Sequence, residues 1–404
     1  MQPNKSNWYF NGNEQKYLQR IIKFGIKSKK NNFNGKLEHA WSDFHNRKFS
    51  ITVNSCTSAL HASFLAIGLK KGDEVLVPAL TPIMCGTTIH LAGGVPIYVD
   101  VNSKDFLLDF ADLKKKITKK TKAILAVHMY SGICDLSELK KIAKKNKIFL
   151  IEDCAESFGA YDQNKNLTGS VGDISCWSFQ AAKQLTCGDG GIISTNNPSI
   201  AKKIRKWSNL GFKALTPMGS NINITKDIRQ NPGYSRFDKI GYNYRLNEFS
   251  AAVALAQLEN FKKIIKLRRQ IGLSFEKIFR NNPYFQTQYI HKNSYSSYYT
   301  FAAYLKTNCK VKWKEFRKTF IKYGGDGIYA ASKLIHQEEA ISNNYIGRCF
   351  SSCKKDCVTK CQGTPKANEL QKRLLLFTTN QRNTLEIKKQ INALNKTLYK
   401  LNLI

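Results

Sequence analysis

A single lysine, Lys183, stands between an apolar segment and a group of glycines in the stretch SFQAAKQLTCGDGG, residues 178–191. The preceding run DISCWS has the apolar character of a buried strand, which places the lysine just beyond the strand's end. A lysine amine becomes a nucleophile toward carbonyl carbons when burial or a neighbouring positive charge lowers its pKa, and it then forms Schiff bases. We interpret Gly188, Gly190 and Gly191 as positions where the backbone lets a flat ligand approach closely.

Two further segments carry groups that complement a phosphorylated, cationic ligand. IEDCAES places Glu152 and Asp153 directly after a β-branched run, where a buried carboxylate needs a partner. VNSCTSALHA leads from small polar residues, Asn54 to Ser58, into an apolar-periodic helix, and N–H groups at a helix N-terminus bind phosphate. Taken singly, these features also fit an ion pair, a plain helix cap and one lysine among many. Together they predict pyridoxal phosphate, which requires a Schiff-base lysine and an acidic partner for its pyridinium nitrogen.

A parallel sheet is the scaffold that these groups require. Strand patterns occur in DEVLVPAL, VPIYVDV, KAILAVHMY, KIFLIEDCAE, DISCWSFQ and GGIISTN. Between KAILAVHMY and KIFLIED, apolar residues at 136, 139, 142 and 143 have helical spacing, and strand–helix–strand of this length indicates a parallel sheet covered by helices. Ligands of such sheets bind beyond the carboxyl ends of the strands. This rule brings together His128, Asp153 and the turn that carries Lys183.

The remaining pattern predicts two domains. From about Asn247 to Asn281 the sequence is strongly helical and indicates one long connecting helix. Beyond it, SSYYTFAAYL and LLLFTT have strand patterns, and a terminal amphipathic helix starts near Glu386. We therefore predict a large α/β cofactor-binding domain over residues 1–260 and a small C-terminal α+β domain over residues 261–404, joined by the long helix.

The chain of 404 residues carries a formal net charge of +35, which has two interpretations. A polyanionic partner is one, and a general excess of lysine, spread along helices and turns, is the other; we favour the second. Nucleic-acid binding ranks last because no helix-turn-helix, RRM or zinc-finger pattern is present. The start of the chain is polar and unlike a signal peptide, and prolines and glycines interrupt the uncharged run 75–99. We expect a cytoplasmic protein without a membrane or nucleic-acid partner.

Eleven cysteines are present, and most lie in apolar runs, as expected of reduced thiols in a cytosol. Four others are spaced four residues apart: Cys349, Cys353, Cys357 and Cys361. Four thiols this close are compatible with zinc or an iron–sulfur cluster. The paired C-x-x-C of a zinc site is absent, so we expect a reduced loop and no metal.

Several motifs in the same order resemble those of the DegT-type sugar-nucleotide aminotransferases, which have the type I fold of aspartate aminotransferase. NSCTSALHA resembles the family's Gly-Thr-x-Ala-Leu segment, and GDEVLVPALT resembles its next strand and loop. IEDCAES matches Glu-Asp-x-Ala-[Gln/Glu], and SFQAAKQLTCGDGG matches Ser-Phe-x-x-x-Lys…Gly-[Asp/Glu]-Gly-Gly. GYNYRLNEFSAAVALAQL matches a further signature. The resemblance covers about residues 50–265 and, more weakly, the rest of the chain to its C-terminus.

The resemblance implies a role for each matched residue. Lys183 would carry pyridoxal 5'-phosphate as a Schiff base and later move a proton, and Asp153 would pair with the pyridinium nitrogen. Glu156 stands near the cofactor's phenolic oxygen, where the family often has Gln. The phosphate would be held by three hydroxyl side chains, those of Thr57, Ser58 and Ser178. Asn243 would reach the phosphate from the other subunit, in a homodimer with shared active sites.

Two matched positions depart from the family. Pro82 follows Thr81 where an aromatic residue usually stacks on the cofactor, and Cys56 stands where Gly is common. The implied activity is transfer of an amino group, with glutamate as donor, to a keto group of a nucleotide-linked sugar, giving an amino sugar for lipopolysaccharide, capsule or another glycan. Which sugar and nucleotide are used, and whether carbon 3 or 4 is aminated, stay open. One alternative is a nucleotide-sugar dehydratase, whose branch replaces the lysine with histidine; the other is a non-catalytic regulator with the same fold.

Overall fold

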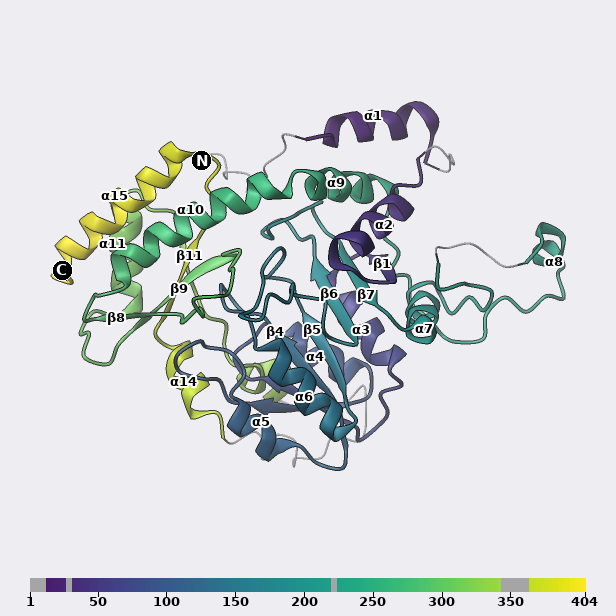
Figure 1. The fold of residues 1–404 in the computed structure, drawn as a ribbon, viewed down its shortest axis with the longest axis horizontal. Helices are drawn as coiled ribbons and strands as arrows, with labels where there is room; N and C mark the ends of the chain where they lie inside the picture. The colour runs from purple at the N-terminus through teal and green to yellow at the C-terminus, as the bar shows by residue number, and fades with distance from the viewer. Residues whose placement is uncertain (1–11, 27–30, 219–223, 343–362) are drawn as a thin grey trace.

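A seven-stranded sheet forms the centre of the molecule (Figure 1). The computed structural model describes residues 12–26, 31–218, 224–342 and 363–404, so the four-cysteine segment with Cys349, Cys353, Cys357 and Cys361 lies outside the described residues. The strands are β1 (Phe49–Val53), β2 (Glu74–Pro78), β3 (Val95–Val99), β4 (Thr121–Val127), β5 (Phe149–Asp153), β6 (Ile174–Ser178) and β7 (Gly191–Thr195). Six of them coincide with the strand patterns of the sequence, which confirms those predictions.

The strand order is β1-β7-β6-β5-β4-β2-β3. Strands β2 to β6 pair in parallel, whereas β7 runs antiparallel to both β6 and β1. Because β3, β2, β4, β5 and β6 are parallel, their carboxyl ends meet at one edge. The mainly parallel sheet with helices on both faces confirms the predicted fold class.

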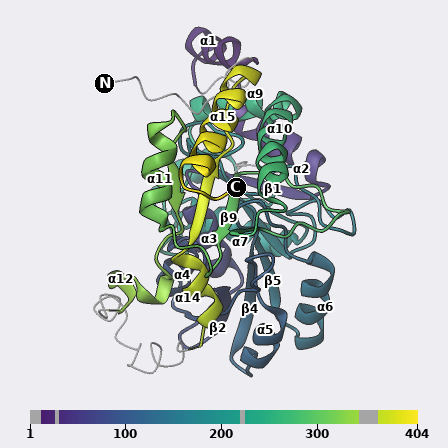
Figure 2. The ribbon, with the colours of Figure 1, turned by 90° about the vertical axis from the view of Figure 1, so that its left-hand side faces the viewer.

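Helices cover the sheet on both faces. Those of the sheet-forming region are α3 (Cys56–Ala66), α4 (Met84–Leu91), α5 (Phe110–Lys116), α6 (Leu136–Asn146) and α7 (Pro198–Ser208). Helix α3 contacts α4 and α7, and α6 packs on β4 and β5. Figure 2 shows α4 and α6 on opposite sides of these two strands. The N-terminal helices α1 (Glu14–Phe24) and α2 (Phe33–His45) pack on α9 (Glu248–Glu259).

A second, antiparallel sheet of four strands lies toward the C-terminus, in the order β10-β11-β9-β8. Its strands are β8 (Phe285–Thr287), β9 (Thr300–Leu305), β10 (Ile328–Ala330) and β11 (Leu374–Thr378). The helices of this region are α11 (Trp313–Lys322), α12 (Glu339–Ser342), α14 (Pro365–Gln371) and α15 (Thr384–Lys400), with a short 3-10 helix, Ile335–Gln337. Helices α11 and α15 contact each other beside the sheet. Buried phenylalanines, among them Phe275, Phe301 and Phe377, fill its core.

The predicted single helix from Asn247 to Asn281 is two helices, α9 and α10 (Phe261–Phe279). Asn260 lies between them with φ −105° and ψ 9°, outside helical geometry, and Asn is a residue that helices prefer at their ends. The predicted division at residue 260 falls at this junction. The division stays a prediction, since one hydrophobic core includes Ala302, Tyr304 and Leu376 of the small sheet together with the large sheet.

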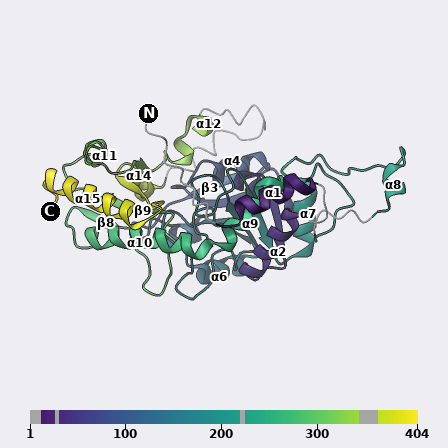
Figure 3. The same ribbon diagram turned by 90° about the horizontal axis from the view of Figure 1, so that it is seen from above.

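One short helix, α8 (Lys226–Gln230), lies apart from the rest of the molecule, at the tip of an extended segment that follows α7 (Figures 1 and 3). Among the residues described, no helix combines the length and the apolar character that crossing a membrane requires.

Candidate active site

Lys183 lies in the turn between β6 and β7, at the carboxyl edge of the sheet. Its Nζ atom is 3.3 Å from Oε1 of Glu156, and the Lys183 side chain is only 14% exposed. On another side, Nζ is 4.1 Å from the centroid of the Tyr299 ring. The second carboxylate oxygen of Glu156 accepts the N–H of Tyr130 at 2.9 Å, which fixes the carboxylate toward the lysine. The amine is therefore held between a carboxylate and an aromatic ring.

These neighbours change the expected ionisation of Lys183. Burial alone lowers its pKa, as the sequence interpretation required of a nucleophile, but Glu156, Tyr299 and Asp153 together outweigh burial and the pKa is raised. That expectation is thus wrong for the chain without a ligand, where the amine is an ammonium ion. A carbonyl compound can react with Lys183 only after a proton leaves it.

Asp153 ends β5 and is 4% exposed. Its Oδ1 atom accepts the N–H of Ala155 at 3.0 Å, and its Oδ2 atom accepts the thiol of Cys85 at 3.3 Å. Burial raises the pKa of Asp153, because one N–H and one weak S–H donor compensate a buried carboxylate poorly. A cationic N–H group placed against Oδ2 would restore the favourable environment of the charge. This is the chemistry that a pyridinium nitrogen offers.

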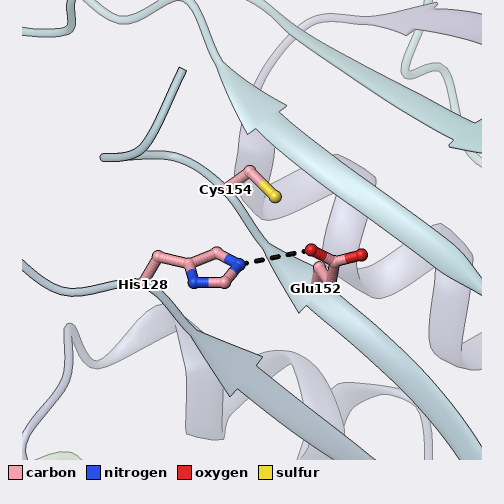
Figure 4. A group of neighbouring side chains, drawn as sticks. All are labelled: His128, Glu152 and Cys154. Atoms are coloured by element: carbon pink, nitrogen blue, oxygen red, sulfur yellow. Dashed lines mark hydrogen bonds and ion pairs between the residues drawn. The ribbon is translucent and has the colours of Figure 1, made fainter. Parts of the chain in front are cut away.

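The neighbouring carboxylate, Glu152, has a different environment (Figure 4). It is fully buried, and its oxygens accept four donors. Oε2 accepts the N–H of Gly169 at 2.7 Å and lies 3.3 Å from Nε2 of His128. Oε1 accepts the N–H groups of Val171 at 3.0 Å and Gly172 at 2.5 Å. Burial raises the pKa of Glu152, but His128 and these amides lower it more, and the net pKa is lowered. Glu152 therefore holds the loop that precedes β6.

His128, Glu152 and Cys154 have the residue types of a metal site, and their ligand atoms lie within 4.8 Å of one another (Figure 4). Nδ1 of His128 accepts the N–H of Cys134 at 3.1 Å, so the proton of the neutral ring is on Nε2, toward Glu152. No lone pair of His128 is left for an ion, and Glu152 is saturated. The group is a structural hydrogen-bond network, and the expectation that His128 joins the ligand-facing groups is wrong.

The predicted phosphate segment forms the start of α3. Ser55 caps the helix, and its Oγ accepts the N–H of Ser58 at 3.1 Å. The Ser58 hydroxyl donates to Oδ1 of Asn54 at 2.6 Å, so it serves the cap itself. N–H groups in the first helical turn have no intrahelical acceptor, which leaves those of Cys56 and Thr57 for a ligand. Thr57 is exposed there, whereas Ser58 is buried.

The glycines after Lys183 have a structural role within the chain itself. A Cβ on Gly191 would lie 2.7 Å from the carbonyl carbon of Ser55 and 2.8 Å from the N atom of Cys56. A Cβ on Gly190 would lie 2.8 Å from Sγ of Cys187, and Gly188 has a φ of +93°. Gly190 and Gly191 thus admit the chain's own side chain and backbone, and Gly188 provides a left-handed backbone conformation. Gly191 in particular brings β7 against the start of α3.

A cavity of about 140 Å³ opens beside Glu156 and is lined by the loops that follow β2, β4 and β5 and by residues of the small sheet. Pro82 lines it, together with three tyrosines, Tyr130, Tyr299 and Tyr329. Motif reading of the sequence missed Tyr299 and Tyr329: SSYYTFAAYL, which contains Tyr299, signals a strand, and nothing in the sequence links either tyrosine to Lys183. The cavity places an aromatic wall next to the position where the aromatic residue of the family motif is replaced by proline.

Two further predicted residues lie near the start of α3 and the turn. Ser178 ends β6, and its Oγ accepts the N–H of Gln180 at 3.3 Å. Asn243 is exposed, and the adjacent Tyr244 accepts the N–H of Asn54 through its carbonyl at 2.8 Å. The backbone of the Asn243 segment thus lies beside the residues that lead into α3, with the Asn243 side chain facing outward.

The chain is similar to known proteins in sequence and in fold. The GDP-perosamine synthase of Escherichia coli O157:H7 is 34% identical over 290 residues, which are 72% of this chain and 73% of the relative. An aminotransferase from Psychrobacter cryohalolentis has a TM-score of 0.82 at 21% identity, with 98% of each chain covered. A GDP-4-keto-6-deoxymannose-3-dehydratase with a trapped PLP-glutamate geminal diamine has a TM-score of 0.78 at 22% identity, covering 96% of this chain and 98% of that chain.

The sequence profile of the DegT/DnrJ/EryC1/StrS aminotransferase family matches residues 9–345, a range that contains Lys183, Asp153, Glu156 and the start of α3. The structural similarities establish the fold, and the sequence match establishes the family. The chain therefore belongs to the DegT/DnrJ/EryC1/StrS aminotransferase family.

Proposed function

We propose that this enzyme is a pyridoxal-phosphate-dependent aminotransferase that transfers an amino group from glutamate to the keto group of a sugar carried by GDP. The observation that supports this most is the pair formed by Lys183, held by Glu156, and Asp153, whose buried carboxylate lacks a strong donor on Oδ2. The GDP-perosamine synthase relative supports the sugar nucleotide, and the PLP-glutamate adduct in the similar dehydratase structure supports cofactor and donor.

The residues present fit the cofactor, which when bound supplies an electron sink for carbanion chemistry. Asp153 would keep the ring nitrogen protonated. The N–H groups of Cys56 and Thr57, with the hydroxyls of Thr57, Ser58 and Ser178, would hold the phosphate at the positive end of α3. Lys183 would bind the aldehyde and, once released, hold or move a proton at Nζ.

Glu156 would influence whether Lys183 carries a proton. Its carboxylate lies 3.3 Å from the Lys183 amine, within reach of the proton on Nζ. The same carboxylate stabilises the ammonium form of Lys183. Glu156 would therefore receive the proton that Lys183 loses when it reacts with a carbonyl group.

A homodimer is the assembly we propose. The segment that follows α7 (residues 211–218 and 224–241) extends from the molecule and exposes Met218, Phe237 and Ile240, the last at 93% (Figure 3). Exposed apolar side chains on a protruding segment mark an interface, and a second copy of the chain would cover them. Asn243, at the end of this segment, would then reach the phosphate in the partner's site.

The test uses the purified protein with added pyridoxal phosphate. The visible spectrum is recorded, the protein is reduced with borohydride and the modified peptide is mapped. A reduced adduct on Lys183 that disappears when glutamate is added before reduction is expected, and Lys183→Arg is the matched control without an adduct. Transfer to a GDP-linked keto sugar is then followed by mass spectrometry of the amino product.

The alternatives give different results in the same experiment. An adduct on Lys183 without a response to glutamate would favour a different amino donor. A sugar product that has lost a hydroxyl group without gaining an amino group would favour the dehydratase. No coloured species and no adduct would refute the enzyme and favour a binding protein with this fold. Light scattering on the same sample measures the mass, and a monomer would refute the shared site.

A further inference from the structure

The small domain supplies an aromatic ring to Lys183. Tyr299 immediately precedes β9, more than a hundred residues after the lysine, yet the Lys183 Nζ atom lies 4.1 Å from the centre of its ring. An ammonium ion over an aromatic face at this distance is attracted by the ring's quadrupole, and the attraction is largest where water is excluded. The neutral amine gains little from the same contact. The ring therefore favours one protonation state of the reacting group.

The backbone around Tyr299 is built to hold this position. Tyr298 has a φ of +47°, which is the left-handed region and costs free energy for a residue with a side chain. The Thr379 hydroxyl lies within hydrogen-bonding distance of the carbonyls of Tyr298 at 2.6 Å and Tyr299 at 2.9 Å. Gly272 of α10 makes room for the Tyr298 ring, because a Cβ there would lie 2.4 Å from it.

Arg268 of α10 connects this backbone to the lysine. It is 4% exposed, and its guanidinium donates to the carbonyl of Lys183 at 3.3 Å and to the carbonyl of Tyr299 at 3.2 Å. A further bond reaches Oγ1 of Thr379 at 3.2 Å. No carboxylate pairs with Arg268 in the described part of the chain, so a costly buried charge is compensated by neutral oxygens alone. Such an arrangement fixes the relative position of the groups that it joins.

We propose that Tyr299 is a further catalytic residue, whose ring stabilises the ammonium form of Lys183, and that Arg268 is the positioning residue that holds the ring against the amine. The inference rests on the proposed function, in which Lys183 alternates between a bound and a free, proton-carrying form. In that cycle the ring would stabilise the free form after Lys183 has taken up its proton.

The test varies the ring without changing its size. Phenylalanine, 4-fluorophenylalanine and 3,4,5-trifluorophenylalanine are placed at position 299, and fluorine progressively weakens the attraction of the ring for a cation. Each protein is freed of bound carbonyl compounds with hydroxylamine and labelled with trace acetic anhydride, which reacts only with neutral amines. Peptide mapping gives the rate at Lys183, and Lys36, 4.8 Å from the ring of Phe33, is the internal reference.

Tyr299→Phe also removes a hydroxyl that hydrogen-bonds to Lys183, so the Phe variant is the baseline of the series. We expect the Lys183 rate to rise to roughly tenfold that of the Phe variant with trifluorophenylalanine. The rate at Lys36 stays constant. An equal Lys183 rate across the series would overturn the role of Tyr299. Because no cofactor is used, this failure is distinct from failure of the proposed function, which shows as a missing borohydride adduct.

Arg268→Lys keeps the charge and loses the two-armed donor. We expect it to raise the Lys183 rate several-fold when Phe is at position 299, and hardly at all with trifluorophenylalanine there, because the two changes act through one contact. Equal factors in both backgrounds would contradict the positioning role. Thr379→Val tests the same arrangement through a second residue, because the Thr379 hydroxyl contacts both Arg268 and the backbone of Tyr299. Arg269→Lys is the matched control, since Arg269 donates to Ser296 and stacks on Tyr295 without reaching Lys183.

Discussion

Glu152 and Asp153, which are adjacent in the IEDCAES motif, are predicted to have different roles. Replacing Glu152 should lower the stability of the fold, whereas replacing Asp153 should lower the activity. In Glu152→Gln an NH₂ group replaces one carboxylate oxygen, and each oxygen of Glu152 faces two donors. Whichever way the amide turns, two N–H donors then face an N–H₂ group. An unsatisfied buried donor costs about 1–3 kcal/mol, so the expected loss in the free energy of unfolding is about 4 kcal/mol.

Asp153→Asn is the matched variant with the opposite outcome. The amide oxygen keeps the N–H of Ala155, and the NH₂ group faces only the sulfur of Cys85. The variant also removes a carboxylate that burial already disfavours, as its raised pKa shows. We expect a change in unfolding free energy below about 1 kcal/mol, together with the loss of most amino transfer from glutamate.

Urea unfolding, followed by the fluorescence of the buried Trp41 and Trp177, measures the first quantity, and the glutamate response of the visible spectrum measures the second. The reasoning is refuted if Glu152→Gln unfolds within about 1 kcal/mol of wild type, because the four-donor geometry would then carry no energy. It is equally refuted if Asp153→Asn keeps full activity.

Three further predictions concern pH, packing and the lysine. Burial lowers the pKa of His45 from 6.5 to about 3. The neutral ring therefore contributes fully to the free energy of unfolding above pH 6.5, and this contribution falls by at most about 5 kcal/mol as the pH drops toward 3. His45→Phe should show a smaller drop in urea midpoint between pH 7 and pH 4 than wild type. Gly272→Ala should lower the melting temperature despite alanine's better helix propensity, because the new Cβ meets Tyr298; an unchanged melting temperature would show that the ring moves aside freely. Glu156→Gln removes the charge that raises the pKa of Lys183, so trace acetic anhydride should label that amine faster, and an unchanged rate would exclude Glu156 as the cause.

The sequence predicts those parts of the site that depend on local order. Asp153 ends a buried strand and Lys183 lies in the turn after another, and parallel strands bring their carboxyl ends to one edge, so both positions follow from pattern alone. The direction in which a side chain points does not follow from the pattern. His128 sits at the same edge, but its ring turns inward because Cys134 and Glu152 satisfy both of its nitrogens.

Contacts between residues that are far apart in the sequence cannot be predicted from local patterns. Tyr299 and Arg268 reach Lys183 only through the packing of α10 and the small sheet, and no spacing in the sequence records that meeting. The break at Asn260 was missed for a related reason: its flanks are strong helix formers, and a single residue's backbone geometry ends the pattern. The glycines near Lys183 were recognised as special, but only the fold tells which atoms they accommodate.

The pairing of the first strand has a consequence for synthesis of the chain on the ribosome. Strand β1 has its partner in β7, about 140 residues later, and α2 packs on α9, about 200 residues later. Because the ribosome adds roughly 5–20 residues per second, α9 is made about 10–40 s after α2. During that time the face of α2 that α9 covers lacks its native partner, although Trp41 can already pack on Phe158, Trp177 and Phe179. The contact of the N-terminal helices with α9 thus forms late although these helices are made first, and a nascent chain stopped before Glu248 leaves the face of α2 that packs on α9 exposed for chaperones to bind.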